Sequence, residues 1–230
     1  MGLANILWQC VKLALRSTVV WILAMRDIRV GLDFVLDDVF AYHISMPDRV
    51  RSDISRPGHL VVCNHTYHGL EGVVFLKYFL DSPERCTVVL RDEYGSRFMV
   101  YLYNRHRYRQ HLPPLTVHWT HESRANNHTV NKCVESLRQN HVVLIFLRRD
   151  KSSKTGVYRI HQQTSCPVVV MTMKTVKRDA VWQFPVLSHR HPRGDHVAVS
   201  ATDWVPAHDS PDTFNRELFR LLGYSISPSS

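Results

Sequence analysis

Short apolar runs alternate with segments of helical periodicity through most of the chain. Five of these runs have the length and composition of buried strands, and they lie at Leu60–Cys63, Cys86–Leu90, Leu115–Val117, Val142–Phe146 and Pro167–Met173. Between the third and fourth runs, Val130, Cys133, Val134 and Leu137 have the i, i+3, i+4, i+7 spacing of one helix face. Strands that alternate with helices are joined by crossovers. The pattern therefore predicts an α/β fold with a mainly parallel central sheet and helices on both faces.

The amino terminus has a different pattern, because it is almost uniformly apolar. From Leu3 to Met25 only Lys12 and Arg16 are charged, and two arginines follow within four residues. Two cations inside the stretch make a complete membrane span marginal. We expect residues 1–30 to form a membrane-associated helix that lies in or dips into one leaflet, with its cations at the lipid head groups. The alternative is an ordinary buried helix.

Turn signals divide the rest of the chain. Pro47 and the pair Pro57-Gly58 interrupt a stretch of mixed apolar and charged residues. We therefore expect residues 31–58 to be a connector and residues 59–223 to be the α/β domain. Residues 224–230 are expected to be a flexible tail.

Charge and cysteine content narrow the choice of partners and compartment. The chain has 29 Lys and Arg against 20 Asp and Glu, for a net charge of +9. This excess favours an anionic partner: phospholipid head groups, a phosphorylated substrate or nucleic acid. The basic segment Arg105–Arg109 suits either a nucleic acid or a lipid head group. The five cysteines are scattered and odd in number, with no disulfide framework and no zinc pair, so we expect a reducing, cytosolic compartment and no metal site.

The first apolar run leads into the residues with the clearest chemistry. It ends on Asn64 and His65, and a helical pattern that carries Glu71 in its first turn begins near Gly69. A carboxylate can hold one nitrogen of an imidazole and leave the other free as a base. We therefore predict that His65 takes a proton from a hydroxyl group and that Glu71 orients it. The alternatives are a satisfied core histidine, an acid that favours the helix dipole and a turn-capping asparagine.

Three motifs in order resemble those of the glycerolipid acyltransferase superfamily, whose members acylate glycerol phosphate and lysophospholipids. That family has an Asn-His at a strand end, then a strand ending in Phe-Pro-Glu-Gly-Thr-Arg-Ser, then a Pro-Val-Val-Pro-type strand. Here the counterparts are Asn64-His65, the segment from Ile145-Phe146 to Ser152, and Cys166-Pro167-Val168-Val169. The resemblance covers roughly residues 55–176.

The resemblance implies direct transfer of an acyl group from acyl-CoA, a co-substrate, with no bound cofactor. His65 and Glu71 would be catalytic. Substrate binding would fall to Asn64 and to the segment after the fourth apolar run, which contains Arg148, Arg149, Lys151 and Ser152. Arginines bind phosphate groups bidentately, so this segment would face the phosphate of the acceptor or of the coenzyme. The partners would be acyl-CoA and membrane phospholipid.

The sequence also departs from the family pattern. The family places its acid five residues after the histidine, whereas Glu71 comes six after His65, and Arg148-Arg149 replace a Glu-Gly pair. Three interpretations remain open: an active O-acyltransferase of phospholipid biosynthesis, an inactive relative that binds lipid or membrane, and a basic nucleic-acid-binding domain. Motif order and the apolar amino terminus favour the first two. We therefore expect an enzyme of glycerolipid metabolism, associated with a membrane, and no nucleic-acid partner.

Overall fold

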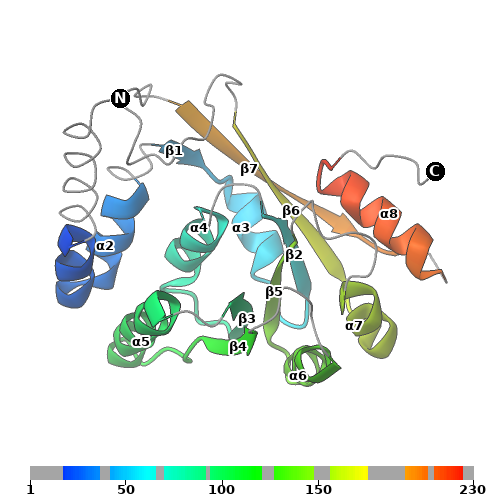
Figure 1. Cartoon of the computed structure of the whole chain (residues 1–230), viewed down its shortest axis with the longest axis horizontal. Coiled ribbons are helices and arrows are strands. Elements are labelled where there is room, and N and C mark those ends of the chain that lie inside the picture. The colour runs from blue at the N-terminus through cyan, green and yellow to red at the C-terminus, as the bar shows by residue number, and fades with distance from the viewer. Residues whose placement is uncertain are drawn as a thin grey trace, which may run out of the picture.

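The computed structural model describes residues 18–36, 42–65, 70–91, 94–120, 127–147, 156–175, 195–206 and 210–224. These residues form a seven-stranded sheet with the order β1-β7-β6-β2-β5-β3-β4 (Figure 1). All its neighbouring pairs are parallel except the antiparallel pair of β6 and β7. The strands are β1 (Tyr42–Ser45), β2 (Leu60–Asn64), β3 (Cys86–Arg91), β4 (Thr116–Thr120), β5 (Val142–Leu147), β6 (Val168–Thr175) and β7 (Asp195–Trp204).

Helices cover both faces of the sheet (Figure 1). On β2, Val61 and Cys63 point into one apolar cluster, and Leu60 and Val62 point into the other. Successive side chains of a strand alternate between faces, so a central strand covered on both sides is apolar throughout. One face is covered by α3 (Asp48–Ile54), α4 (Leu70–Phe79) and α5 (Tyr94–Arg109), with α2 (Ile28–Phe34) packed against α4 and α5. The other face is covered by α6 (Asn127–Arg138), α7 (Gly156–Thr164) and α8 (Pro211–Leu221). The predicted α/β class, with its mainly parallel sheet and helices on both faces, is confirmed.

Each of the five predicted strands is present, but the sheet has two more. The short edge strand β1 and the helix α3 both lie in residues 31–58, where we expected only a connector. β1 pairs in parallel with β7, and β7 pairs with β6 from Val168↔Trp204 to Thr175↔Val197. The two added strands therefore extend the sheet beyond β6.

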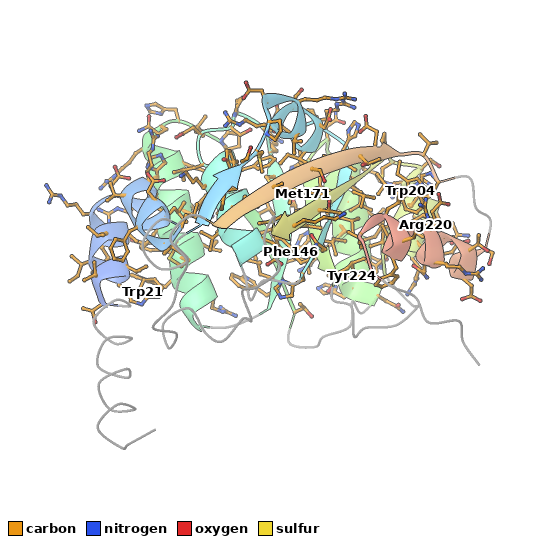
Figure 2. All side chains as sticks on the ribbon, turned by 90° about the horizontal axis from the view of Figure 1, so that it is seen from above. Trp21, Phe146, Met171, Trp204, Arg220 and Tyr224 are labelled. Carbon is orange, nitrogen blue, oxygen red and sulfur yellow. The ribbon has the colours of Figure 1, made fainter. Side chains whose placement is uncertain are left out.

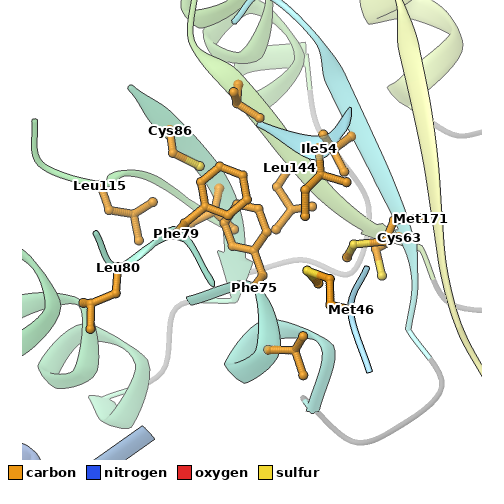
Figure 3. Packing of buried hydrophobic residues seen from close by; sticks show 14 of the residues in the cluster. Met46, Ile54, Cys63, Phe75, Phe79, Leu80, Cys86, Leu115, Leu144 and Met171 are labelled. Carbon is orange, nitrogen blue, oxygen red and sulfur yellow. The ribbon is translucent and has the colours of Figure 1, made fainter. Parts of the chain in front are cut away.

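The buried face of α4 is organised by two phenylalanines (Figure 3). Phe75 and Phe79 are one helical turn apart, and their stacked rings have centroids 4.2 Å apart. Both pack into the cluster that contains Cys63 and Leu144 from the central strands. Side chains four residues apart share a helix face, so Glu71, one turn before Phe75, is also directed at the sheet. The spacing of the apolar residues in α4 thus directs Glu71, in the first turn of the helix, toward the end of β2.

Candidate active site

His65 immediately follows β2, the middle strand of the sheet. Its backbone N–H donates to the carbonyl oxygen of Leu147, the last residue of β5, at 2.8 Å. This bond continues the parallel ladder, in which Asn64 is opposite Leu147. The side chain is 33% exposed, and its ring centroid lies 6.0 Å from that of Phe146. The sheet therefore fixes the backbone of His65 while part of its imidazole remains open to solvent.

The carboxylate of Glu71 lies beside this imidazole. His65 Nδ1 and Glu71 Oε2 are 3.4 Å apart, and the Glu71 side chain is fully buried. The distance is suitable for an ion pair and slightly longer than a typical N–H···O hydrogen bond. Glu71 is in the first turn of α4, where the helix dipole also favours a negative charge. The structure thus brings together the two residues predicted to be catalytic, at a spacing of six residues.

Cys63 lies close to this pair but has the wrong chemical form for a nucleophile. Burial, together with the charge of Glu71, raises the pKa of the Cys63 thiol well above its ordinary value. Only the thiolate attacks carbonyl carbons efficiently. Cys63 is therefore a small apolar residue of the core.

The Asn64 side chain connects β2 to β6, a role that the sequence did not indicate. Its buried side chain makes two hydrogen bonds to the backbone of Met173 in β6: Nδ2 donates to the carbonyl oxygen at 3.2 Å, and Oδ1 accepts from the N–H at 2.9 Å. The backbone pairing of β2 with β6 ends one residue earlier, at Cys63↔Met171. The amide therefore extends this pairing and holds the end of β2, and substrate binding by Asn64 stays a prediction.

The other residues predicted to bind substrate, Arg148, Arg149, Lys151 and Ser152, lie outside the described residues. In the sequence they directly follow Leu147, whose carbonyl oxygen accepts the N–H of His65.

Sequence reasoning missed one residue of the site, Tyr224, which we expected to begin a flexible tail. Tyr224 is buried and lies beside α8 (Figure 2). Its hydroxyl donates to the Leu147 carbonyl oxygen at 2.7 Å. The same hydroxyl oxygen accepts from the His65 N–H at 3.0 Å. Tyr224 therefore contacts the main chain on both strands that border the site.

A sequence signal for this position does exist, at the end of α8. Gly223 has a φ of +77°, a conformation that glycine adopts readily. Its N–H donates to the Arg220 carbonyl oxygen at 3.0 Å, and the Tyr224 N–H donates to that of Phe219 at 2.9 Å. These two bonds are those of a Schellman motif, which ends a helix at a glycine. A glycine directly after an amphipathic run would have predicted an ordered helix end here.

The described structure holds a second imidazole–carboxylate pair, His106 Nε2 and Asp81 Oδ1, which are 3.3 Å apart beyond the end of α4, where Arg29 also contacts Asp81. Within the described ranges, no three His, Cys, Asp or Glu side chains gather as a metal site would require. A cleft of about 670 Å³ lies at the far end of α4, and several of its charges pair with one another. Arg29 contacts Asp81 at 2.8 Å, and Lys77 contacts Asp33 at 2.7 Å. This cleft is separated from Glu71 by the length of the helix.

No protein-family model matches this chain, and no curated protein matches it at a significant level.

Proposed function

We propose that this protein is an O-acyltransferase that transfers a fatty acyl group from acyl-CoA to a hydroxyl of glycerol phosphate or a lysophospholipid. The proposal is carried by the partly exposed His65 imidazole and the buried Glu71 carboxylate, 3.4 Å apart at the end of the middle strand. In open α/β sheets, ligands bind outside the carboxyl ends of the strands. The order of the three sequence motifs supports the same reaction.

The pair can act as a base and its orienting partner. With the Glu71 carboxylate beside Nδ1, the other ring nitrogen, Nε2, is left to take the proton of the acceptor hydroxyl. The acceptor oxygen then forms a bond to the thioester carbonyl carbon. As the carbon–sulfur bond breaks, the coenzyme A thiolate leaves and takes the proton from the imidazolium, which the carboxylate has stabilised. Burial raises the pKa of the Cys63 thiol well above its ordinary value, so Cys63 is a poor acyl-accepting nucleophile, which supports direct transfer to the acceptor.

Replacing Glu71 by glutamine should slow this reaction about a hundredfold in kcat, because the variant keeps the size of the side chain but loses the charge that stabilises the imidazolium. KM for both substrates should change little. Steady-state rates with purified protein measure both quantities. Glu135→Gln, on the outer side of α6, is the matched control and should have wild-type rates. Wild-type kcat in Glu71→Gln would remove Glu71 from the mechanism.

We assign phosphate binding to the segment that follows β5. Arg148, Arg149, Lys151 and Ser152 come directly after Leu147, at the strand end that borders His65. Two guanidinium groups suit bidentate contacts with a phosphate. The acceptor phosphate or the phosphates of the coenzyme would then be held beside the base.

We also propose that the helical segment 18–26 lies on a membrane surface. Ile22 and Met25 are 54% and 48% exposed, whereas Ala24 is buried. Ala24 packs closely on Gly31 of α2. A Cβ atom added at Gly31 would lie only 2.7 Å from the Cβ atom of Ala24. On the same segment, Trp21 contacts Phe98 of α5 with ring centroids 5.1 Å apart. One side of the segment is thus held by the protein, and the other presents apolar side chains.

This arrangement suits an interfacial helix. Among the described residues, no helix has both the length and the apolar character needed to cross a bilayer. Apolar side chains on a helix that carries flanking cations bind at the boundary of head groups and acyl chains, and the net charge of +9 favours anionic lipid. The membrane would then supply the acceptor lipid and the acyl donor.

Replacing Ile22 and Met25 together by asparagine should weaken binding to vesicles roughly tenfold or more, because two exposed apolar side chains no longer enter the interface. Co-sedimentation with vesicles of equimolar phosphatidylcholine and phosphatidylglycerol measures this. Val205→Asn, at another exposed apolar residue, should bind like wild type. These point variants are preferable to deletion of the segment, because Ala24 and Ile28 belong to the core. If the double variant sediments like wild type, the segment does not dock on membranes.

A transfer assay tests the proposed activity. The full-length protein is incubated with labelled oleoyl-CoA and with glycerol 3-phosphate or one of a panel of lysophospholipids. We expect a labelled acyl product with at least one acceptor. No product with any acceptor, together with vesicle binding, would favour the inactive lipid-binding relative. Salt-dependent binding to nucleic acid without vesicle binding would favour the third interpretation.

A further inference from the structure

The Tyr224 hydroxyl closes a triangle of main-chain hydrogen bonds at the site. It donates to the Leu147 carbonyl oxygen at 2.7 Å and accepts from the His65 N–H at 3.0 Å. The same N–H also approaches the Leu147 carbonyl oxygen at 2.8 Å. A hydroxyl group both donates and accepts, so one side chain joins the end of β5 to the first residue after β2.

His65 lies just after the point where backbone pairing of β2 with its two neighbours, β5 and β6, ends. Backbone pairing of β2 with β5 extends to Asn64↔Leu147, whereas pairing with β6 ends at Cys63↔Met171. On the β6 side, the Asn64 side chain takes over the contact. His65 is thus the first residue after the paired residues of β2. Its N–H still donates to Leu147, and the Tyr224 hydroxyl adds a contact that the strands do not supply.

The backbone and ring of Tyr224 are both held in place by contacts with α8. The Schellman motif fixes its backbone to the last turn of α8. Its ring lies 5.7 Å from that of Phe219, between centroids, in the contact that commonly accompanies this motif. On the same helix, Phe214 and Leu218 are fully buried in the cluster on the other face of the sheet from α4. The position of the hydroxyl therefore follows from the packing of α8.

We propose that Tyr224 is a positioning residue for His65. Its hydroxyl fixes the backbone of His65, and with it the direction of the imidazole relative to Glu71 and to the acceptor hydroxyl. Catalytic groups must be held to within a fraction of an ångström, so a small shift of the base lowers turnover strongly. Tyr224 acts through His65 and does not touch the substrate. The kinetic part of this inference rests on the proposed acyltransferase function.

Tyr224→Phe removes only the hydroxyl and tests the inference directly. We expect kcat for acyl transfer to fall about tenfold, while KM for acyl-CoA and for the acceptor stays within about twofold. Leu218→Val is the matched control, because it lowers the melting temperature through the same helix without touching the hydroxyl. Assayed well below its melting temperature, it should keep the wild-type kcat. Wild-type kcat in Tyr224→Phe, or an equal loss in Leu218→Val, would overturn the inference.

A second measurement does not depend on turnover. We expect the His65 backbone amide, followed by NMR hydrogen exchange, to exchange about tenfold faster in Tyr224→Phe than in wild type. In Tyr224→Phe the rate should rise more at the His65 amide than at the Cys63 amide of the preceding strand, whereas Leu218→Val, which lowers global stability, should raise both rates by the same factor. Unchanged exchange at His65 would overturn the inference even if kcat fell. Faster exchange in a protein whose wild type transfers no acyl group would support the positioning contact and refute the proposed function.

Discussion

His65→Ala should abolish acyl transfer and leave the protein folded. The imidazole is the proposed base, and general-base catalysis alone contributes roughly a hundredfold to ten-thousandfold to rate. Alanine keeps the backbone N–H that donates to Leu147 and Tyr224, so the end of β2 retains its contacts. The side chain is partly exposed, so its removal opens no closed cavity in the core. Initial rates with labelled oleoyl-CoA measure the loss, and circular dichroism verifies the fold.

The control for this variant must separate loss of the base from loss of any histidine. His111→Ala replaces an exposed histidine in the turn after α5 and should have wild-type kinetics. Because His111 has a positive φ of 57°, the control variant is slightly strained, which makes full activity in it a stringent comparison. Robust transfer by His65→Ala would show that a different group removes the proton, and the mechanism proposed here would be wrong.

The sequence predicted the middle of the sheet better than its ends, for physical reasons. Strands β2 and β5 are buried on both faces, so their apolar runs stand out in the sequence. β7 has the sequence Asp-His-Val-Ala-Val-Ser-Ala-Thr-Asp-Trp, in which polar residues interrupt every short apolar stretch. β1 has only four residues and lies at the edge of the sheet. Neither strand has enough apolar residues to be distinguished from a loop.

The residues of the candidate site also differ in how well the sequence predicted them. Local spacing placed His65 at a strand end and Glu71 in the first turn of the next helix, and these two positions are close because the chain between them is short. Tyr224 reaches the site from 159 residues away in the sequence, through the packing of α8. No local pattern predicts which strand end such a residue will meet. The sequence did contain a signal for the ordered helix end, but not for its contact with His65.

The basic segment Arg105–Arg109 contains both exposed and buried arginines. Arg105 and Arg109 are exposed, as a surface that binds anions requires, but Arg107 between them is almost completely buried. Its guanidinium group donates to the carbonyl oxygens of Phe79 and Leu80 at the end of α4. Composition alone could not separate the three arginines. A helix turns by about 100° per residue, so residues 105, 107 and 109 point in different directions.

Arg107→Leu should destabilise the fold by about 3–5 kcal/mol, a large part of the stability of a typical domain. Besides Phe79 and Leu80, the guanidinium group donates to the carbonyl oxygens of Pro113 and Glu84, the latter at 3.1 Å. Leucine fills much of the volume but removes this donor from all four acceptors. Phe79 still accepts the Ser82 N–H at 3.2 Å, whereas a buried polar group left without a partner costs about 1–3 kcal/mol. The positive charge at the end of α4 is also lost, where the helix dipole favours it.

Urea denaturation followed by circular dichroism measures the change, and two variants on the same helix sharpen it. Arg107→Lys keeps the charge, but a single ammonium group cannot reach carbonyl oxygens in three separate segments, so its stability should lie between those of wild type and Arg107→Leu. Arg105→Leu, at an exposed position two residues away, should change the free energy of unfolding by no more than about 0.5 kcal/mol. Equal midpoints for Arg105→Leu and Arg107→Leu would show that the buried guanidinium group adds nothing to stability. If the free energy of unfolding is lowest for Arg107→Leu, as expected, Arg107 stabilises the carboxyl end of α4. Glu71 lies in the first turn of the same helix.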